Sequence, residues 1–236
     1  MKVAVLQSNY IPWKGYFDII NRADIFIFYD DVQFTKKDWR TRNKIKTHGG
    51  LKWLSVPCLG SQHSLICEIK IDQSSNWQRK HWTTIVNSYG KAKYFNKYKH
   101  FFEELYLDKK WLWLSEFNQY TIMKISREIL GINTEFKDSR EFTLSNDKFK
   151  EDRWIPLLKQ LNTREYILGP AAKNYLDEKT LINEGIKIHW MDYSGYSEYQ
   201  QLYPPFEHHV SIIDLIFNVG ADFLYYISNQ NNAHNV

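Results

Sequence analysis

The sequence predicts an α/β protein with a parallel, Rossmann-like sheet, an inserted β-hairpin region and a helical block. Three observations predict this class. Residues 2–29 have the strand–helix–strand spacing of a βαβ unit. Residues 134–219 again alternate short apolar strands with helices. Between them the alternation stops, and no Pro-, Gly- or Ser-rich linker divides the chain. We therefore expect residues 1–236 to form a single α/β domain, with a β insertion at about 40–72 and a helical insertion at about 75–130.

The first unit begins with an apolar strand at Lys2–Gln7, followed by a helix at Gly15–Asn21 and a second strand at Asp24–Tyr29. In the helix, Tyr16, Ile19 and Ile20 recur along one side. A parallel pair with a right-handed crossover follows from this order. Because open parallel sheets bind ligands beyond the carboxyl ends of their strands, the polar segments after both strands are expected at a binding edge.

The middle of the chain departs from this alternation. Asn43–Thr47 and Leu51–Pro57 flank a His-Gly-Gly turn, which predicts a hairpin, and residues 67–72 alternate like another strand. Three helical segments follow at 74–90, 94–107 and 111–130, with Ser74 and Ser75 as expected N-caps and Gly131 as a C-cap.

The α/β pattern then resumes as a series of short elements. The expected strands are Thr134–Lys137, Glu165–Leu168 and Lys187–Met191, and the expected helices are Arg153–Leu161 with Pro156 in its first turn, Glu178–Asn183 closed by Gly185, and Ser211–Val219 ending at Gly220.

Composition and charge limit the classes of protein to which this chain can belong. A net charge of +4 and a pI near 8.8 favour anionic partners only mildly, and they do not indicate a nucleic-acid-binding protein. Two cysteines do not form a disulfide framework, and no apolar run reaches the roughly 18 residues of a membrane span. We expect a cytoplasmic protein.

Two groups of charged residues are candidates for chemistry. Asp30 and Asp31 end the second strand, where one of them would act as a general base or hold Arg40 or Lys36; alternatively they are there because aspartate suits turns, which the residues alone favour. The second group is a basic run that comprises Lys36, Lys37, Arg40, Arg42, Lys44 and Lys46. It would bind phosphates, or it would simply be a solvated face of the hairpin.

Two later motifs are also candidates. The segment Gly169–Lys173, GPAAK, follows a strand and would hold an anion, or would be only a tight turn. Asp214 and Asn218 share a face of an apolar helix, so they are structural anchors or site residues, and the pattern does not separate the two.

Other signals point away from specific chemistries. The adjacent His208 and His209 do not suit a single ion, so no metal is expected. Cys58 has no local nucleophile signature and is expected to be a small buried thiol. No Walker, GxSxG or HExxH sequence is present, and no cofactor is expected.

A resemblance to a known protein family adds information that residue spacing does not give. QSNYIPWKGYFDII (7–20) and FIFYDDVQFTKKDWRTRNKIK (26–46) resemble the opening of the WbqC-like family, and WLSVPCLGSQ, ILGPAAKNYLDE and VSIIDLIFNVG follow in the family's order. The family-like positions are Gln7, Tyr10, Pro12, Trp13, Gly15, Tyr16, Asp30, Asp31, Gln33, Lys36, Trp39, Arg40, Asn43, Gly169, Pro170, Lys173, Asp214 and Asn218. The chain departs from the family pattern at Cys58, in the Ala-Ala of GPAAK, and at His208 and His209.

The resemblance implies a bacterial protein linked to surface-polysaccharide genes such as O-antigen clusters, which tailors a nucleotide-linked sugar. One form of this idea is acyl or aminoacyl transfer to a sugar amine from a carrier protein. Asp30, Asp31 and Gln7 would then be catalytic. The basic run and GPAAK would hold a diphosphate or a phosphopantetheine, and Tyr10 and Trp13 would pack on a sugar or base. The remaining family-like polar positions would contact substrate. The alternatives are a non-catalytic scaffold that binds a carrier protein or another partner, and a nucleotidyltransferase-like enzyme.

Overall fold

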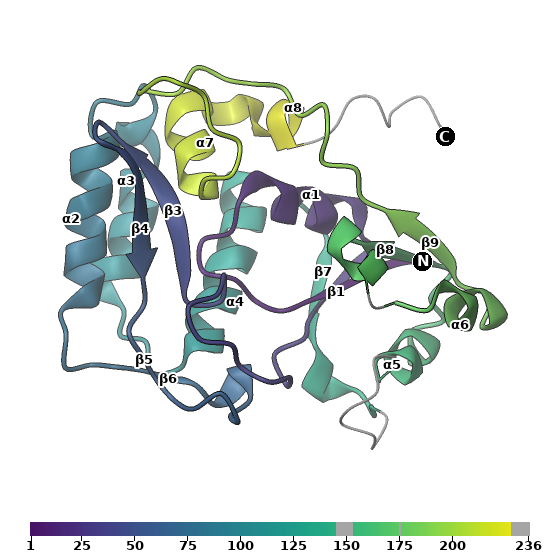
Figure 1. Cartoon of the computed structure of the whole chain (residues 1–236). Helices are drawn as coiled ribbons and strands as arrows, with labels where there is room; N and C mark the ends of the chain where they lie inside the picture. The colour runs from purple at the N-terminus through teal and green to yellow at the C-terminus, as the bar shows by residue number, and fades with distance from the viewer. Residues whose placement is uncertain (145–152, 175, 228–236) are drawn as a thin grey trace.

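The computed structural model describes residues 1–144, 153–174 and 176–227 (Figure 1). Five strands form a parallel sheet in the order β7-β2-β1-β8-β9, which confirms the predicted α/β class. The strands are β1 (Lys2–Leu6), β2 (Ile25–Phe28), β7 (Glu135–Asp138), β8 (Glu165–Leu168) and β9 (Lys187–Trp190). Each strand lies within two residues of its predicted bounds, because short apolar runs between turn signals are well defined in sequence.

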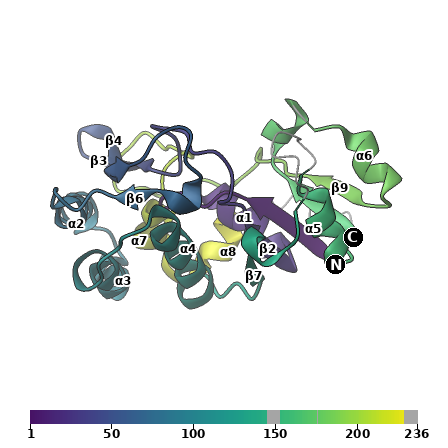
Figure 2. The same cartoon turned by 90° about the horizontal axis from the view of Figure 1, so that it is seen from below.

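Apolar side chains alternate between the two faces of the sheet. From β1, Val3 and Val5 join one core cluster while Ala4 joins the other. The Val3 side is covered by α5 (Ile155–Gln160) and α6 (Glu178–Asn183). The Ala4 side is covered by α1 (Lys14–Arg22), with α7 (Ile212–Val219) and α8 (Phe223–Ile227) beyond it (Figure 2).

The inserted β-region contains the expected hairpin. Strands β3 (Arg42–Thr47) and β4 (Gly50–Ser55) pair antiparallel with Lys44 opposite Trp53. The prediction of a strand over 67–72 is wrong in its first half. Residues 66–68 form a 3₁₀ turn, because the Glu68 carboxylate accepts a 2.9 Å hydrogen bond from the Leu65 amide and closes the turn. Only β6 (Lys70–Ile71) is extended, and it pairs with β5 (Cys58–Leu59).

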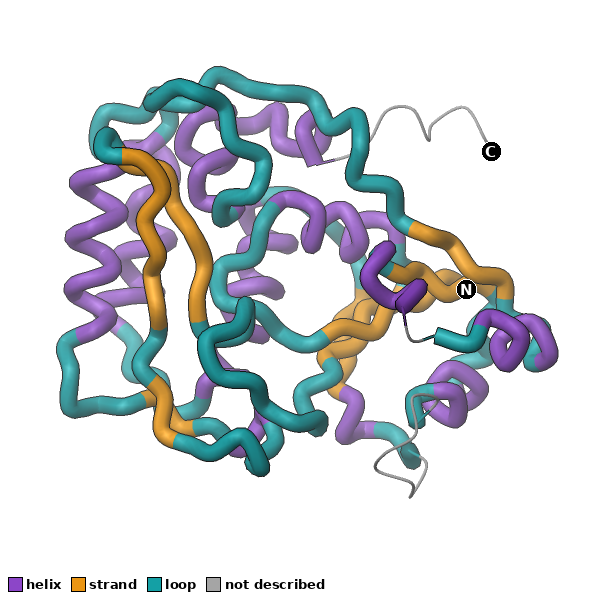
Figure 3. Tube along the Cα trace, in the orientation of Figure 1, coloured by secondary structure: helices purple, strands orange, loops and turns teal. Residues whose placement is uncertain are grey.

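The helical block consists of α2 (Trp77–Tyr89), α3 (Phe95–Glu103) and α4 (Leu114–Lys124), and it lies beside the hairpin (Figure 3). The last two continue as π turns at Glu104–Asp108 and Ile125–Ile129. The expected serine caps of α2 are wrong: Asn76 occupies the N-cap, while the Ser74 amide donates to Asp72 in the preceding turn. None of the helices in the described residues is both long and apolar enough to cross a membrane.

The order of the strands reverses at β1. The chain proceeds outward from β1 to β2 and β7, and then returns to add β8 and β9 on the other side of β1. The helix α1 that follows β1 and the helix α6 that follows β8 therefore pack on opposite faces. The loops that leave these two neighbouring strands diverge, which opens a crevice at the carboxyl edge of the sheet.

Candidate functional site

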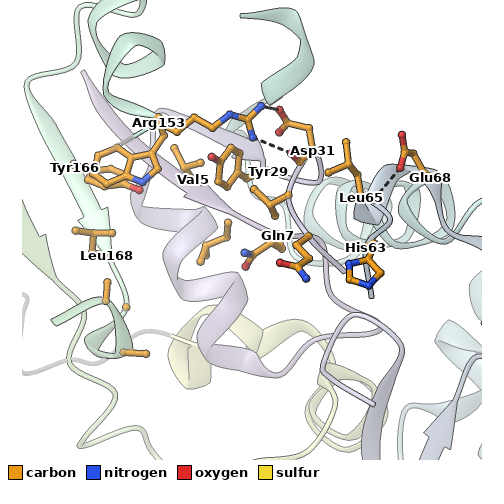
Figure 4. A pocket seen from close by; sticks show the side chains of 17 residues that line it. Val5, Gln7, Tyr29, Asp31, His63, Leu65, Glu68, Arg153, Tyr166 and Leu168 are labelled. Atoms are coloured by element: carbon orange, nitrogen blue, oxygen red, sulfur yellow. Dashed lines mark hydrogen bonds and ion pairs between the residues drawn. The ribbon is translucent and has the colours of Figure 1, made fainter. Parts of the chain in front are cut away.

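A cavity of about 890 Å³ occupies this crevice. Its residues come from the ends of β1, β2 and β8, from the inserted loop before β6, and from the start of α5 (Figure 4). They are Val5, Leu6, Gln7, Tyr29, Asp31, Val32, Gln33, His63, Leu65, Glu68, Arg153, Trp154, Tyr166, Leu168, Gly169, Ala171 and Ala172. A volume of this size is within the range of small-molecule sites.

One wall of the cavity is polar. Gln7 follows β1, and its amide side chain points toward the cavity, as does the imidazole of His63 from the opposite loop (Figure 4). Gln33 is anchored by a 2.7 Å hydrogen bond from its amide nitrogen to the Gln62 carbonyl. These groups offer hydrogen-bond donors and acceptors of the kind that orient a sugar or a similarly polar ligand.

An ion pair crosses the rim of this wall. The Arg153 guanidinium donates to the Asp31 carboxylate at 2.8 Å and to the Asp31 carbonyl at 2.9 Å. The second carboxylate oxygen of Asp31 accepts a hydrogen bond from the Ser139 hydroxyl. The two side chains are 17% and 12% exposed, so the pair is partly screened from water while still facing the cavity.

The opposite wall is apolar. The rings of Trp154 and Tyr166 lie with their centroids 4.9 Å apart, and Leu168 and the two alanines of GPAAK extend the surface. Gly169 stands where a Cβ would lie 3.2 Å from the Tyr193 hydroxyl, so a larger residue would crowd that ring. An apolar wall with two aromatic rings, opposite polar groups, suits a ligand with one apolar face, such as a sugar ring or a base.

The structure brings four of the sequence-predicted residues to this cavity: Gln7, Asp31, Gln33 and Gly169. Asp30 points elsewhere. It is fully buried, and its oxygens accept hydrogen bonds from the Ser8 amide and the Gln119 side chain, both at 2.8 Å. Burial raises the pKa of Asp30 despite these bonds. Asp30 therefore anchors the loop after β1 to α4, and only the second aspartate of the pair faces a ligand-sized space.

Tyr10 is also buried rather than open to a ligand. Its hydroxyl lies 2.7 Å from Nδ1 of His81 and 2.6 Å from the Tyr106 hydroxyl. Burial lowers the pKa of His81 to about 4, so the ring is neutral near pH 7. Because the ring also bonds the backbone of Ser55, Nδ1 accepts from Tyr10, which accepts in turn from Tyr106. This chain of bonds holds the loop against the helical block.

Trp13 supports the start of α1. It stacks on His209 at 5.2 Å and meets Tyr193 edge-on at 5.0 Å. A Cβ at residue 15 would lie 2.3 Å from the Trp13 ring, which explains the glycine there. The aromatic loop thus packs against the C-terminal part of the chain, outside the residues that line the cavity.

The predicted cationic residues also lie outside the cavity lining. Lys36 and Trp39 are exposed, and Arg40 pairs with Asp38. Asn43 is buried and donates to the carbonyl of Ile11 at 2.8 Å. Lys173 lies 5.1 Å from the centre of the Trp190 ring.

Asp214 and Asn218 belong to a buried network. The Asp214 carboxylate accepts from the hydroxyls of Tyr89 and Tyr199 at 2.9 and 2.8 Å, and from the amide of Gln201 at 2.9 Å. The Asn218 amide donates to the Asp214 carbonyl. Of the two interpretations left open by the sequence, the geometry therefore favours structural anchors.

Six polar or aromatic residues of the cavity were not predicted from the sequence as site residues: Tyr29, His63, Glu68, Arg153, Trp154 and Tyr166. Tyr166 is on a predicted strand and Arg153 opens a predicted helix, yet neither has a local motif. His63 and Glu68 come from the insertion, whose position against the sheet is not encoded in any short pattern. Of these residues, Tyr166 is one whose position could have suggested a site residue, because it lies on the predicted strand three residues before Gly169.

Other reactive groups are poor candidates. Burial raises the pKa of the Cys58 thiol to about 12, so it is not a ready nucleophile. Among residues 1–144, 153–174 and 176–227, no group of three His, Cys, Asp or Glu side chains is placed to hold a metal ion.

Comparisons with known proteins agree on one relationship. A model of the WbqC-like protein family matches residues 7–226. The uncharacterized protein Rv1507c of Mycobacterium tuberculosis is 42% identical over 223 residues, which cover 94% of this chain and 95% of that protein. No solved structure matches the chain.

Proposed function

The chain belongs to the WbqC-like protein family, and from this premise we propose that it is an enzyme that transfers an acyl or aminoacyl group to the amine of a nucleotide-linked sugar. The observation that supports this proposal is the cavity at the strand-order reversal, where Gln7 and Asp31 follow adjacent parallel strands and face one ligand-sized space. In the proposed setting, the product would enter a bacterial surface polysaccharide.

The proposed reaction needs a group that accepts a proton. A sugar ammonium with a pKa of about 8 to 10 must lose its proton before the nitrogen attacks the acyl carbonyl carbon. A new C–N bond then forms, the bond from the acyl carbon to its donor breaks, and the departing donor group takes up a proton. Asp31 supplies a carboxylate that orients the amine and accepts the proton, and Gln7 supplies an amide to hold the sugar hydroxyls.

The apolar wall completes the binding mode. Trp154, Tyr166 and Leu168 would pack on the less polar face of the sugar. Asp30, Tyr10, Asn43 and Asp214 are given no substrate contact in this proposal, because each is buried and engaged in internal hydrogen bonds.

The test is calorimetry with a uridine-diphosphate amino sugar, followed by turnover with an acyl thioester donor. We expect micromolar binding, and we expect Asp31→Asn to retain binding but to lose turnover while the melting temperature changes little. Asp108→Asn is the matched control, because Asp108 is exposed on the helical block. Absence of nucleotide-sugar binding, or full turnover in Asp31→Asn, would sink the proposal.

A second candidate function, a partner-binding scaffold, is favoured by the outer face of the hairpin. There the Arg42 guanidinium lies 4.3 Å and the Lys44 ammonium 5.3 Å from the centre of the Trp53 ring, with Trp39 beside it at 5.6 Å. Residues 35–55 hold seven basic residues and one acidic residue, a net charge of +6, while the whole chain carries +4. Such a surface is complementary to an acidic protein, for instance a carrier protein.

This alternative has its own test. A purified acyl carrier protein should bind the wild type, and Arg42→Glu combined with Lys44→Glu should abolish binding, whereas Lys91→Glu on the helical block should not. Carrier binding without any nucleotide-sugar binding would favour the scaffold over the enzyme.

A further inference from the structure

We infer that the Asp31–Arg153 pair is an exchange site: a phosphate on the ligand takes Arg153, and Asp31 is thereby released to hold the ligand's amine. This inference rests on the proposed function, because it concerns how the same cavity recognises its substrate. It identifies the substrate class as one that carries an anionic phosphate and an amine together.

The first support is a hydrogen-bond donor of Arg153, its Nε, that lacks an acceptor among the described residues. Two of its nitrogens donate to Asp31, but its Nε is buried and has no hydrogen-bond partner among residues 1–144, 153–174 and 176–227. A buried donor without an acceptor costs about 1 to 3 kcal/mol, so the guanidinium is not at its most favourable arrangement. A guanidinium fork with a spare donor at the rim of a cavity is well suited to bidentate contact with phosphate oxygens.

The second support is the charge of the side chains that line the cavity. Among the lining residues that the structure describes, Arg153 is the one with a permanent positive charge. The basic hairpin, for which the sequence left phosphate binding and a solvated face as alternatives, contributes no lining residue. A ligand phosphate that enters this space therefore meets Arg153 as its main cationic partner.

The third support is the saturation of Asp31. One of its oxygens accepts from Ser139 and the other from Arg153. In this state the carboxylate is occupied and its charge is offset, so it is poorly placed to accept a proton from an amine. Removing Arg153 would free one oxygen, while Ser139, a fully buried residue, would keep the carboxylate in position.

The exchange conserves strong interactions. Arg153 exchanges its charge-assisted contact with Asp31 for one with the phosphate, and Asp31 exchanges the guanidinium for the ligand's ammonium. A ligand with only a phosphate would leave Asp31 unpaired, and a ligand with only an amine would have to displace Arg153 without giving it a new partner. The pair therefore discriminates in favour of ligands that carry both groups. In this role Arg153 is a positioning residue for Asp31 as well as an anion receptor.

Calorimetry with three small sugars tests this. Methyl glucosaminide carries the amine alone, N-acetylglucosamine 1-phosphate carries the phosphate alone, and glucosamine 1-phosphate carries both. For the wild type we expect glucosamine 1-phosphate to bind at least about tenfold more tightly than either of the others, which corresponds to about 1.4 kcal/mol.

The variants give the decisive contrast. Arg153→Met keeps an unbranched apolar side chain at this position and removes the charge. It should bind methyl glucosaminide more tightly than the wild type does, because Asp31 is freed, and it should lose the preference for phosphate. Asp31→Asn should bind N-acetylglucosamine 1-phosphate at least as tightly as the wild type, and it should lose the preference for the amine. A pair with a purely structural role would produce neither gain.

The outcomes separate the two proposals. If the wild type binds none of these sugars and no nucleotide sugar, both the exchange and the proposed function fail. If the wild type binds them but neither variant shows its expected gain, the exchange alone is overturned. Pantetheine 4′-phosphate serves as a second phosphate source: Arg153-dependent binding of this compound, but not of the sugar phosphates, would assign the phosphate to the donor and overturn the inference. Should Arg153→Met fail to fold, the Asp31→Asn titrations decide the question.

Discussion

Two regions of this protein hold polar side chains in apolar surroundings, and they differ in what those side chains face. In the cavity at the carboxyl edge of the sheet, the side chains of Gln7 and His63 point into open space (Figure 4). In the network around α7, Asp214 is about 1% exposed and is surrounded by internal donors. A polar residue after an apolar run thus marks a site only where the fold leaves room beside it; elsewhere the same pattern marks a buried anchor.

The largest expected effect separates the two aspartates. Asp214→Ala leaves the hydroxyls of Tyr89 and Tyr199 and the Gln201 amide without their acceptor, and we expect it to lower the free energy of unfolding by about 3 to 5 kcal/mol. Asp31→Ala, at a partly exposed ion pair on the cavity rim, should cost no more than about 1 to 2 kcal/mol. Urea unfolding of both variants measures the difference, and equal losses would contradict the distinction between anchor and site.

The next effect concerns the anchor formed by Tyr10, His81 and Tyr106. The pKa of His81 is about 4 in the folded protein, below its ordinary value of 6.5, chiefly because of burial. The unfolded chain therefore binds a proton first as the pH falls, so this part of the stability is fully present above pH 6.5 and is lost as the pH falls toward 4. The loss approaches about 3 kcal/mol.

The control for this prediction is His81→Gln, which has no titratable group at this position. Its stability should show a shallower decline between pH 6.5 and 4 than that of the wild type when both are unfolded with urea. Parallel pH profiles for the two proteins would mean that the ring does not stay neutral and buried.

A smaller effect is expected at Lys14, the first residue of α1, which does not line the cavity. Its ammonium donates to the Ser197 carbonyl and is surrounded by the rings of Tyr196, Tyr199 and Phe206. Burial lowers the pKa of Lys14 to about 8. The folded protein therefore loses this proton first as the pH rises, and its stability increases between about pH 8 and 10.5.

We expect this gain to be about 2 kcal/mol, less than the full shift would give, because the three rings attract the charged form. Lys14→Met lacks the titration and serves as the reference. The difference in unfolding free energy between the two proteins, measured at pH 7 and pH 10, should move in favour of the wild type. No change in that difference would show that Lys14 is charged and well solvated at both pH values.

The contrast between the two regions also explains what the sequence could predict. The strands and most helices were predicted because their apolar periodicity and glycine or proline boundaries are local features. Gln7, Asp31 and Gln33 were expected together because the carboxyl ends of parallel strands meet at one edge, whereas Gly169 was a candidate through the GPAAK turn and the family resemblance. Tyr10 and Asp214 were also candidates, but both lie in buried hydrogen-bond networks, and local sequence does not reveal whether a polar group faces a cavity or an internal partner. Arg153 and His63 reach the cavity only through long-range packing.

The smallest change in stability is expected at Gln7, and a glutamine in the other region provides a matched comparison. The Gln201 side chain accepts from Lys46 and the Glu207 amide and donates to Asp214, so Gln201→Ala should cost about 2 kcal/mol or more and leave sugar binding in the folded fraction unchanged. Gln7→Ala should lower the free energy of unfolding by less than about 0.5 kcal/mol, because the side chain faces the cavity. The Tyr16 hydroxyl donates to the main-chain carbonyl of residue 7, and the substitution keeps this bond. The same variant should weaken nucleotide-sugar binding about tenfold, measured by calorimetry, through the loss of one or two ligand hydrogen bonds. If Gln7→Ala instead destabilised the fold and left the ligand's affinity intact, the cavity would be one more part of the scaffold.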